Sequence, residues 1–385
     1  MSDQKKISFP TSSEESEPSV AESTSGPGHE APPEPVAPAA TINADSNAAV
    51  GLEPLLQLAS QLKALDFHPV VIVGNSFSGK TSLITSLLAA LKLEADWEVG
   101  ANLKDPVLPQ NTDIGRKQHE DATRIFNKVV QEFIAGKGAE KTQTTYPFFI
   151  PISLRSGRLG QTLNVAFLES NGEAYTPRMD SDRFFADLQE VTETFIRDFQ
   201  GGISFIYVLP YTQVNVRGLN EDLADDPNRL RLAEHAIVGV LQAYDTIRMD
   251  KSKDRHLLLV SKWDAHLEKK KIEEQITIGE VLLDTHSDIR PFLRATYPQA
   301  LASFNALSVD QPQRQITNYC SGLMTGRKVQ PTGADPEISQ AIRSHQKKLW
   351  SWIWSSASGY TVSPFPEPVP PSPIDRFFRW LTSWL

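Results

Sequence analysis

The sequence predicts an α/β fold with a mostly parallel central sheet that is covered by helices on both faces. Short apolar runs, often β-branched, alternate with longer segments in which apolar residues recur at helical spacing. A run that is apolar at every position indicates a strand buried on both faces, as in a parallel sheet between two helical layers. A glycine-rich loop joins the first such run, residues 70–73, to the helical segment after it.

Each expected element rests on its own pattern. Before the glycine-rich loop, leucines at helical spacing from Leu52 to Leu65 predict an amphipathic helix. Apolar runs on either side of a Ser-Gly-Arg turn predict a β-hairpin of residues 146–154 and 162–168. The remaining expected elements are helices at 83–91, 125–134, 184–199, 230–247 and 340–354, buried strands at 203–209 and 256–260, and a weaker strand at 303–309.

The two ends of the chain differ in composition from its middle. Residues 1–47 are rich in Ser, Glu, Pro and Ala, so we expect a disordered tail there. Residues 48–356 would form the α/β domain, and a proline-rich linker would occupy residues 357–373. Residues 374–385 place apolar side chains on one helical face, which predicts an amphipathic docking helix. It would bind a protein groove or a membrane surface, or pack back on its own domain.

Composition restricts the class of protein. The chain has 385 residues and a formal net charge of −9, which argues against nucleic acid as a general partner. The single cysteine, Cys320, excludes an internal disulfide framework and fits the reducing cytoplasm. No uninterrupted apolar stretch is long enough to span a bilayer as a helix. We therefore expect a cytoplasmic protein that reaches a membrane only peripherally, if its terminal helix binds lipid.

One motif carries specific chemistry. Residues 74–81 read GNSFSGKT and fit the phosphate-binding pattern G-x-x-x-x-G-K-[ST] without a mismatch. Gly74 and Gly79 allow the backbone to approach a phosphate, and successive N–H groups at the helix start attract the anion. Lys80 would neutralise phosphate charge, and the Thr81 hydroxyl would bind Mg²⁺. The candidate phosphate-binding residues are Gly74, Asn75, Ser76, Phe77, Ser78, Gly79, Lys80, Thr81 and Ser82. The motif favours a three-layer P-loop NTPase fold, although an ordinary glycine turn is the alternative interpretation.

Two later stretches distinguish between kinds of nucleotide. Residues 168–173, LESNGE, end an apolar run; Glu169 would hold Mg²⁺ through a water, and the Gly172 N–H would face a γ-phosphate. Residues 261–264, SKWD, directly follow a buried strand. They resemble the [NT]KxD box that reads guanine, which implies that Asp264 accepts both guanine donors, a pair that adenine lacks, and that the Lys262 stem covers the base plane. A polar turn and a solvated turn, respectively, are the alternative interpretations.

In this order the motifs resemble those of P-loop GTPases of the TRAFAC class, over roughly residues 66–355. Glu169, the long segment before Thr144 and the Leu- and Trp-rich closing helix are similar, more loosely, to the prokaryotic double-GTPase family of multi-gene conflict systems. The resemblance implies that Thr144 or Thr145 reaches Mg²⁺ and the γ-phosphate, and that residues 305–308 touch the base. It also places Glu173 where many GTPases use glutamine to orient the attacking water.

The resemblance does not predict how residue 261 contacts the P-loop. Ser261 stands where the family has asparagine or threonine, so the usual contacts of this position with the P-loop are not implied.

The sequence thus predicts a GTP-binding protein, a slow GTPase used as a switch, with GTP or GDP and Mg²⁺ as cofactors. The expected catalytic residues are Lys80, Glu173 and Thr145, and the expected metal ligands are Thr81, Thr144, Thr145 and Glu169. A P-loop ATPase, and a pseudo-GTPase scaffold that binds nucleotide without turning it over, are the alternatives. The LESNGE and SKWD motifs argue against a small-molecule kinase. No arginine finger can be identified, so we expect slow intrinsic hydrolysis that a partner accelerates. Separately, residues 374–385 would bind a protein partner or touch a membrane, with little coupling to the nucleotide site.

Overall fold

The structure of the chain is a computed structural model that describes the residues of the α/β domain with internal gaps. The described ranges are 53–75, 78–135, 148–169, 183–211, 227–266, 288–310, 313–320, 323–324, 327–328, 336–360 and 363–365. The predicted tail at 1–47 and the predicted docking helix at 374–385 lie outside these ranges. They stay predictions.

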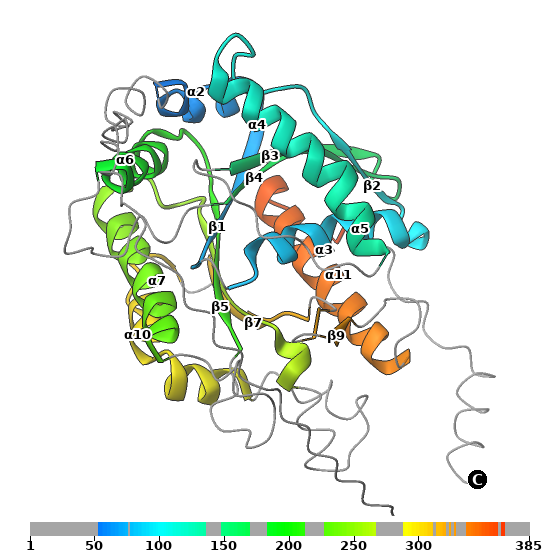
Figure 1. Cartoon of the computed structure of the whole chain (residues 1–385), viewed down its shortest axis with the longest axis vertical. Coiled ribbons are helices and arrows are strands. Elements are labelled where there is room, and N and C mark those ends of the chain that lie inside the picture. The colour runs from blue at the N-terminus through cyan, green and yellow to red at the C-terminus, as the bar shows by residue number, and fades with distance from the viewer. Residues whose placement is uncertain are drawn as a thin grey trace, which may run out of the picture. The chain divides into compact units, whose positions relative to one another are not determined.

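A seven-stranded sheet forms the centre of the described structure (Figure 1). Its strands lie in the order β2 (Val99–Leu103), β3 (Phe148–Ser156), β4 (Gln161–Glu169), β1 (Phe67–Val73), β5 (Ser204–Pro210), β6 (Arg255–Ser261) and β7 (Arg314–Asn318). From β4 to β7 every pairing is parallel, whereas β3 is antiparallel to both of its neighbours. The short strands β8 (Leu323–Met324) and β9 (Arg327–Lys328) pair separately. The predicted mostly parallel sheet and its hairpin are confirmed.

Helices cover both faces of this sheet. On one face lie α2 (Leu58–Ala64), α6 (Arg183–Asp198), α7 (Pro227–Ile247) and α10 (Pro298–Asn305), and on the other lie α3 (Lys80–Leu93), α5 (Val130–Ile134) and α11 (Pro336–Ser358) (Figure 1). Alternate residues of β1 serve the two layers: Val71 and Val73 belong to one hydrophobic cluster, Val70 and Ile72 to the other. The domain therefore has three layers, with the sheet between two layers of helices, as predicted. Within the described ranges, no helix has the length and apolar character needed to cross a bilayer.

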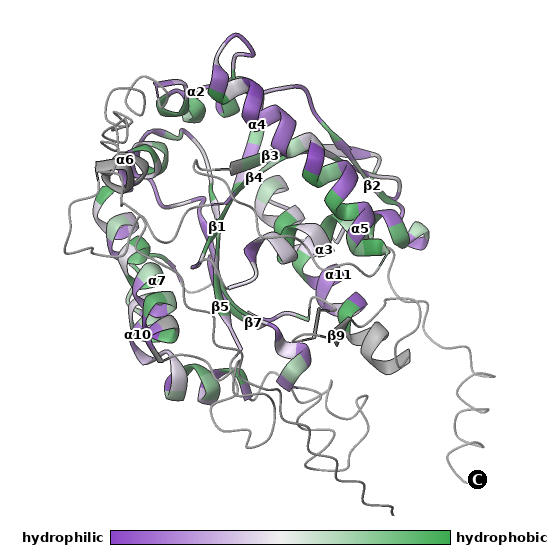
Figure 2. Ribbon diagram, viewed as in Figure 1, coloured by the Kyte–Doolittle hydropathy of each residue, from purple (hydrophilic) through white to green (hydrophobic). Residues whose placement is uncertain are grey.

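The helix predicted at 125–134 begins earlier than expected. It starts with α4 (Asp113–Arg124), continues through a π-helical turn (Ile125–Val129) and ends with α5. The Thr112 side chain caps α4 by accepting a hydrogen bond from the Gly115 N–H at 3.1 Å. Because α4 is polar over most of its surface, as Figure 2 shows, apolar spacing alone did not indicate it.

The strand predicted at 303–309 is wrong. Residues up to Asn305 belong to α10, and the last strand of the sheet is β7, whose sequence RQITN contains one strongly apolar residue. The other edge strand, β2, with the sequence VGANL, was also unpredicted. An edge strand has a partner on one side only and exposes part of its surface, so it needs no continuous apolar run.

Residues after α11 return to the domain. Helix α11 extends to Ser358, beyond its predicted end, and the Ser156 hydroxyl donates to the Pro364 carbonyl at 3.0 Å. Phe365 is buried, with its ring centroid 4.9 Å from that of Trp97. The segment from 363 to 365, which falls within the predicted linker, therefore packs against the hairpin and the region before β2.

Two histidines lie near the amino-terminal ends of parallel strands. His256 in β6 is fully buried, and its Nδ1 is 3.1 Å from the Tyr207 hydroxyl. His68 in β1 has its Nε2 2.8 Å from the Ser204 hydroxyl. Burial lowers the pKa of His256 from 6.5 to about 3 and that of His68 to about 4. Both imidazoles are therefore neutral in the folded chain at neutral pH.

These pKa shifts predict loss of stability in mild acid. Both histidines bind a proton more readily in the unfolded chain, so the free energy of unfolding falls as the pH drops below about 6.5. For each histidine, the slope should be about 0.7 kcal/mol per pH unit at pH 6.5, where the unfolded imidazole is half protonated, and should rise toward about 1.3 kcal/mol per pH unit near pH 5. Urea unfolding at several pH values measures it. His68→Asn should roughly halve the slope, and a flat profile above pH 5 would contradict the assignment.

Candidate functional site

The loops that carry the predicted motifs follow the carboxyl ends of neighbouring parallel strands, on one side of the sheet. Strands β4, β1, β5 and β6 run parallel, and register pairs Ile72 with Glu169 and Pro210 with Ser261 near their carboxyl ends. Ligands of open α/β sheets bind outside the carboxyl ends of the strands. The loop after β1, the end of β4 and the loop after β6 therefore form one candidate site.

The glycine-rich loop is closely packed against the sheet. A Cβ on Gly74 would lie 2.4 Å from the Ser78 hydroxyl and 2.8 Å from the Val208 carbonyl oxygen, so no larger residue fits. Gly79 has φ of 85° and caps α3, which begins at Lys80. The Ser78 hydroxyl donates to the Asn75 carbonyl at 2.9 Å and closes the turn. The loop thus ends at a helix N-terminus, where anions are favoured.

Lys80 lies folded over this loop. Its ammonium donates to the Gly74 carbonyl at 2.7 Å and to the Asn75 carbonyl at 2.8 Å. The same nitrogen is 3.7 Å from Glu169 Oε1, and the exposed fractions of the two side chains are 7% and 16%. A mostly buried ammonium needs acceptors and counter-charge, and these three oxygens supply both.

The predicted metal ligands Thr81 and Glu169 meet directly. The Thr81 hydroxyl donates to Glu169 Oε2 at 3.2 Å. A hydroxyl and a carboxylate are the hard oxygen donors that Mg²⁺ prefers, and Mg²⁺ commonly takes few protein ligands beside waters and phosphates. The donor set at the start of α3 therefore fits this ion. Ser82 lies in the same first helical turn and is partly buried.

The SKWD loop is fastened to the glycine-rich loop. Ser261 ends β6, and its hydroxyl donates to the Ser78 carbonyl oxygen at 2.6 Å. Lys262 adopts a left-handed conformation with φ of 56°, which turns the chain sharply after the strand. Ser261, which stands where the family has asparagine or threonine, therefore still contacts the glycine-rich loop. This hydrogen bond joins the two loops that carry the motifs.

The rest of the SKWD loop is buried, unlike a solvated turn. Trp263 is fully buried and packs against Tyr211 and His266, with ring centroids 5.5 Å and 4.3 Å away. Asp264 has an exposed fraction of 1%. A carboxylate this deeply buried must be compensated by its surroundings, and such groups are frequent at functional sites.

The loop after β7 also reaches this side of the sheet, and sequence reasoning missed it. The Tyr319 N–H donates to the Val260 carbonyl at 2.8 Å, and the Tyr319 hydroxyl lies 2.6 Å from the Ser86 hydroxyl on α3. Cys320 follows, fully buried, and burial together with the charge of Asp264 raises the pKa of its thiol. A tyrosine-cysteine pair after a polar strand gave no recognisable signal.

The predicted contact of residues 305–308 with the base is wrong. The Ser308 hydroxyl and N–H donate to the Asp245 carboxylate at 3.1 Å and 3.2 Å, near the end of α7. These residues precede β7, so they lie toward the amino-terminal end of the strands. The final strand comes later in the sequence than predicted, and the loop that follows it is Tyr319-Cys320.

Several predicted site residues cannot be placed. They lie outside the described residues and keep the roles that the sequence predicts; they are Ser76, Phe77, Thr144, Thr145, Gly172 and Glu173.

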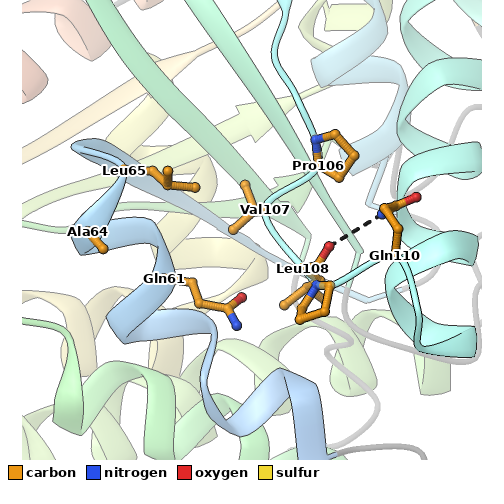
Figure 3. A pocket seen from close by; sticks show the side chains of 8 residues that line it. Gln61, Ala64, Leu65, Pro106, Val107, Leu108 and Gln110 are labelled. Carbon is orange, nitrogen blue, oxygen red and sulfur yellow. Dashed lines mark hydrogen bonds between the residues drawn. The ribbon is translucent and has the colours of Figure 1, made fainter.

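A separate hollow of about 530 Å³ lies between α2 and the segment after β2. Figure 3 shows Gln61, Ala64 and Leu65 on one side of it and the segment 106–110 on the other. The Gln110 amide donates to the Leu108 carbonyl at 3.3 Å. No lining residue belongs to the loops that carry the motifs, so the hollow is not part of the candidate site.

Comparison with known proteins gives limited information. No protein-family model and no curated protein matches the chain. Among solved structures, the crystal structure of a dimerization-deficient mutant of Toc33 from Arabidopsis thaliana matches 81% of this chain and 93% of that one, at 11% identity and a TM-score of 0.33. A likeness this low bears on neither the fold nor the function.

The hydrogen bond between Ser261 and Ser78 should contribute measurably to the stability of the folded chain. Ser261→Ala removes the hydroxyl and leaves the Ser78 carbonyl without this hydrogen bond. The free energy of unfolding should fall by about 1–3 kcal/mol. Ser261→Thr keeps the hydroxyl but adds a methyl group at a buried position, so it should lose less stability than the alanine variant. Urea unfolding compares the three chains. Equal stability of the alanine and threonine variants would show that the hydrogen bond contributes nothing.

Proposed function

We propose that the chain binds guanine nucleotides together with Mg²⁺ and hydrolyses GTP slowly, as a nucleotide-dependent switch. The observation that carries this proposal is the hydrogen bond of 2.6 Å from the Ser261 hydroxyl to the Ser78 carbonyl. It links the loop suited to phosphates to the loop suited to a base. A nucleotide needs both at a fixed separation, which two independently moving loops would not provide.

The phosphates would lie at the N-terminus of α3. The helix end offers N–H donors and the positive end of its dipole, while Lys80 offers a mostly buried ammonium within the same loop. Charge-assisted hydrogen bonds of this kind are stronger than neutral ones, particularly where water is excluded. Asn75, Ser76, Phe77 and Ser78 would contribute their backbone N–H groups.

Mg²⁺ would be held by Thr81 and Glu169 together with phosphate oxygens. When bound, the ion would neutralise part of the phosphate charge and polarise the transferred group. The Thr81 hydroxyl has a single hydrogen, which it donates to Glu169, so its oxygen lone pairs point elsewhere. That arrangement suits a hydroxyl that serves as a metal ligand, with Thr144 or Thr145 as further ligands when GTP is present.

The base would be read by Asp264. Its carboxylate lies in a water-excluded loop, where it would accept the N1–H and the exocyclic amine of guanine. With adenine, the same carboxylate would face an acceptor and lose both bonds, which is costly in a buried site. Lys262, on the sharp turn before it, would cover the base plane. Guanine is therefore favoured over adenine, and a GTPase over an ATPase.

The proposal of slow hydrolysis rests on Glu173. Lys80 and Thr145 would be the other catalytic residues. A carboxylate beside the γ-phosphate can orient the attacking water but also repels the phosphate. Residues 374–385 would recruit a protein partner, with little direct coupling to the nucleotide site. A scaffold that binds GTP without hydrolysing it differs only in this step, and single-turnover hydrolysis by the purified chain separates the two functions.

The base assignment predicts a change of nucleotide preference. Asp264→Asn replaces an acceptor pair by one acceptor and one donor, which suits the extra carbonyl of xanthine. Affinity for GTP should fall about tenfold or more, and affinity for XTP should rise, as expected for a charged hydrogen bond worth about 1.5–3 kcal/mol.

Competition binding with GTP, ATP and XTP measures this shift. Asp310→Asn removes the same charge from an exposed position after α10 and serves as the control, with an unchanged preference expected. A parent chain that binds ATP as tightly as GTP, or an Asp264→Asn variant that keeps its full preference for GTP, would contradict the proposed function.

A further inference from the structure

The Glu169 carboxylate lies between the glycine-rich loop and the first turn of α3. It contacts both groups that a nucleotide and its metal would use: the Lys80 ammonium at 3.7 Å and the Thr81 hydroxyl at 3.2 Å. The carboxylate is thus close enough to act as a counter-charge of the phosphate-binding lysine. A nucleotide phosphate would need the same place beside the ammonium.

The sheet fixes where this carboxylate starts. Glu169 is the last residue of β4 and is paired in register with Ile72 of β1 on one side and with Phe148 of β3 on the other. Its backbone is held between two strands, so only the side chain can move. Glutamate is one methylene longer than aspartate, and this length brings the carboxylate across to the first turn of α3.

Electrostatics then decide when a phosphate can enter. Without a divalent cation, a bound phosphate would lie beside the negative Glu169 carboxylate in a mostly buried site, where like charges repel strongly. With a divalent cation, the carboxylate would be neutralised and would release Lys80. The Thr81 hydroxyl, which already donates to Glu169, would keep its oxygen available to the cation.

We propose that Glu169 is a metal-dependent gate: its carboxylate occupies Lys80 and repels phosphate in the absence of a divalent cation, and admits phosphate when a divalent cation is present. The proposal rests on the proposed function for the identity of the ligand, but its central contact is between residues of this chain.

The experiment measures the affinity for inorganic pyrophosphate and for GDP by isothermal titration, in EDTA and in Mg²⁺. Glu169→Gln keeps the length of the side chain and an acceptor for Thr81 but removes the charge. In EDTA, this variant should bind pyrophosphate about tenfold more tightly than the parent chain. In Mg²⁺ the gain should vanish or reverse, because the metal loses an anionic ligand.

Glu120→Gln is the matched control, since it removes the same charge from an exposed position on α4 and should match the parent chain in both conditions. The parent chain gives a second measurement: Mg²⁺ should tighten its pyrophosphate binding by about 100-fold or more. Equal affinity of the parent chain and Glu169→Gln in EDTA overturns the gate. A gain from Mg²⁺ of less than about threefold in the parent chain also overturns it, even if the variant does not fold.

Failure of the proposed function gives a different result. A parent chain that prefers ADP to GDP, while the pyrophosphate contrast between EDTA and Mg²⁺ holds, would contradict guanine binding and support the gate. Pyrophosphate carries no base, so its binding reports the phosphate site alone.

Discussion

The parallel pairing of β1 with β4 on one side and with β5 on the other is the constraint on which the rest of the structure depends. Register aligns Ile72 with both Glu169 and Ile206, so the loops after neighbouring strands start at the same level. The strands are buried on both faces, and a slip by one residue would exchange the two hydrophobic clusters. The sheet therefore fixes the distance between the glycine-rich loop and the Glu169 carboxylate.

Helix α3 is held from several sides, which is consistent with a preformed anion site. The Tyr319 hydroxyl contacts the Ser86 hydroxyl, and the Trp350 indole N–H donates to the Leu87 carbonyl at 2.9 Å. Ser261 fixes the loop before the helix. Residues from the end of β6, the loop after β7 and α11 thus converge on one short segment. A site whose groups are held by surrounding contacts loses little entropy when a ligand binds.

The sequence predicted the parts of the fold and site that depend on local chemistry. Buried strands such as β5 and β6 are continuous apolar runs. The motif of residues 74–81 indicated Lys80 and Thr81 at the start of a helix, and the LESNGE stretch indicated Glu169 as a further ligand. The edge strands β2 and β7 were missed, because one-sided pairing leaves no apolar signature. That omission also misplaced the last loop, which Tyr319 and Cys320 form.

Contacts between distant segments could not be read from the sequence. A serine after a strand has no pattern that reveals a hydrogen bond to residue 78, and a glutamate does not show whether its side chain faces a lysine. These contacts depend on the register of the sheet and on the path of the loops. Hydrogen bonds of this kind follow from the tertiary structure, and they are what make separate motifs into one candidate site.

Hydrogen exchange of the backbone amides tests most directly whether the two loops bind one nucleotide. The chain is compared with and without GDP and Mg²⁺, with peptides that separate residues 74–81 from residues 261–264. We expect GDP to protect both segments, since one ligand would contact phosphate-binding amides and the base-reading loop at once. Protection of residues 74–81 alone, with unchanged exchange at 261–264, would contradict the single site.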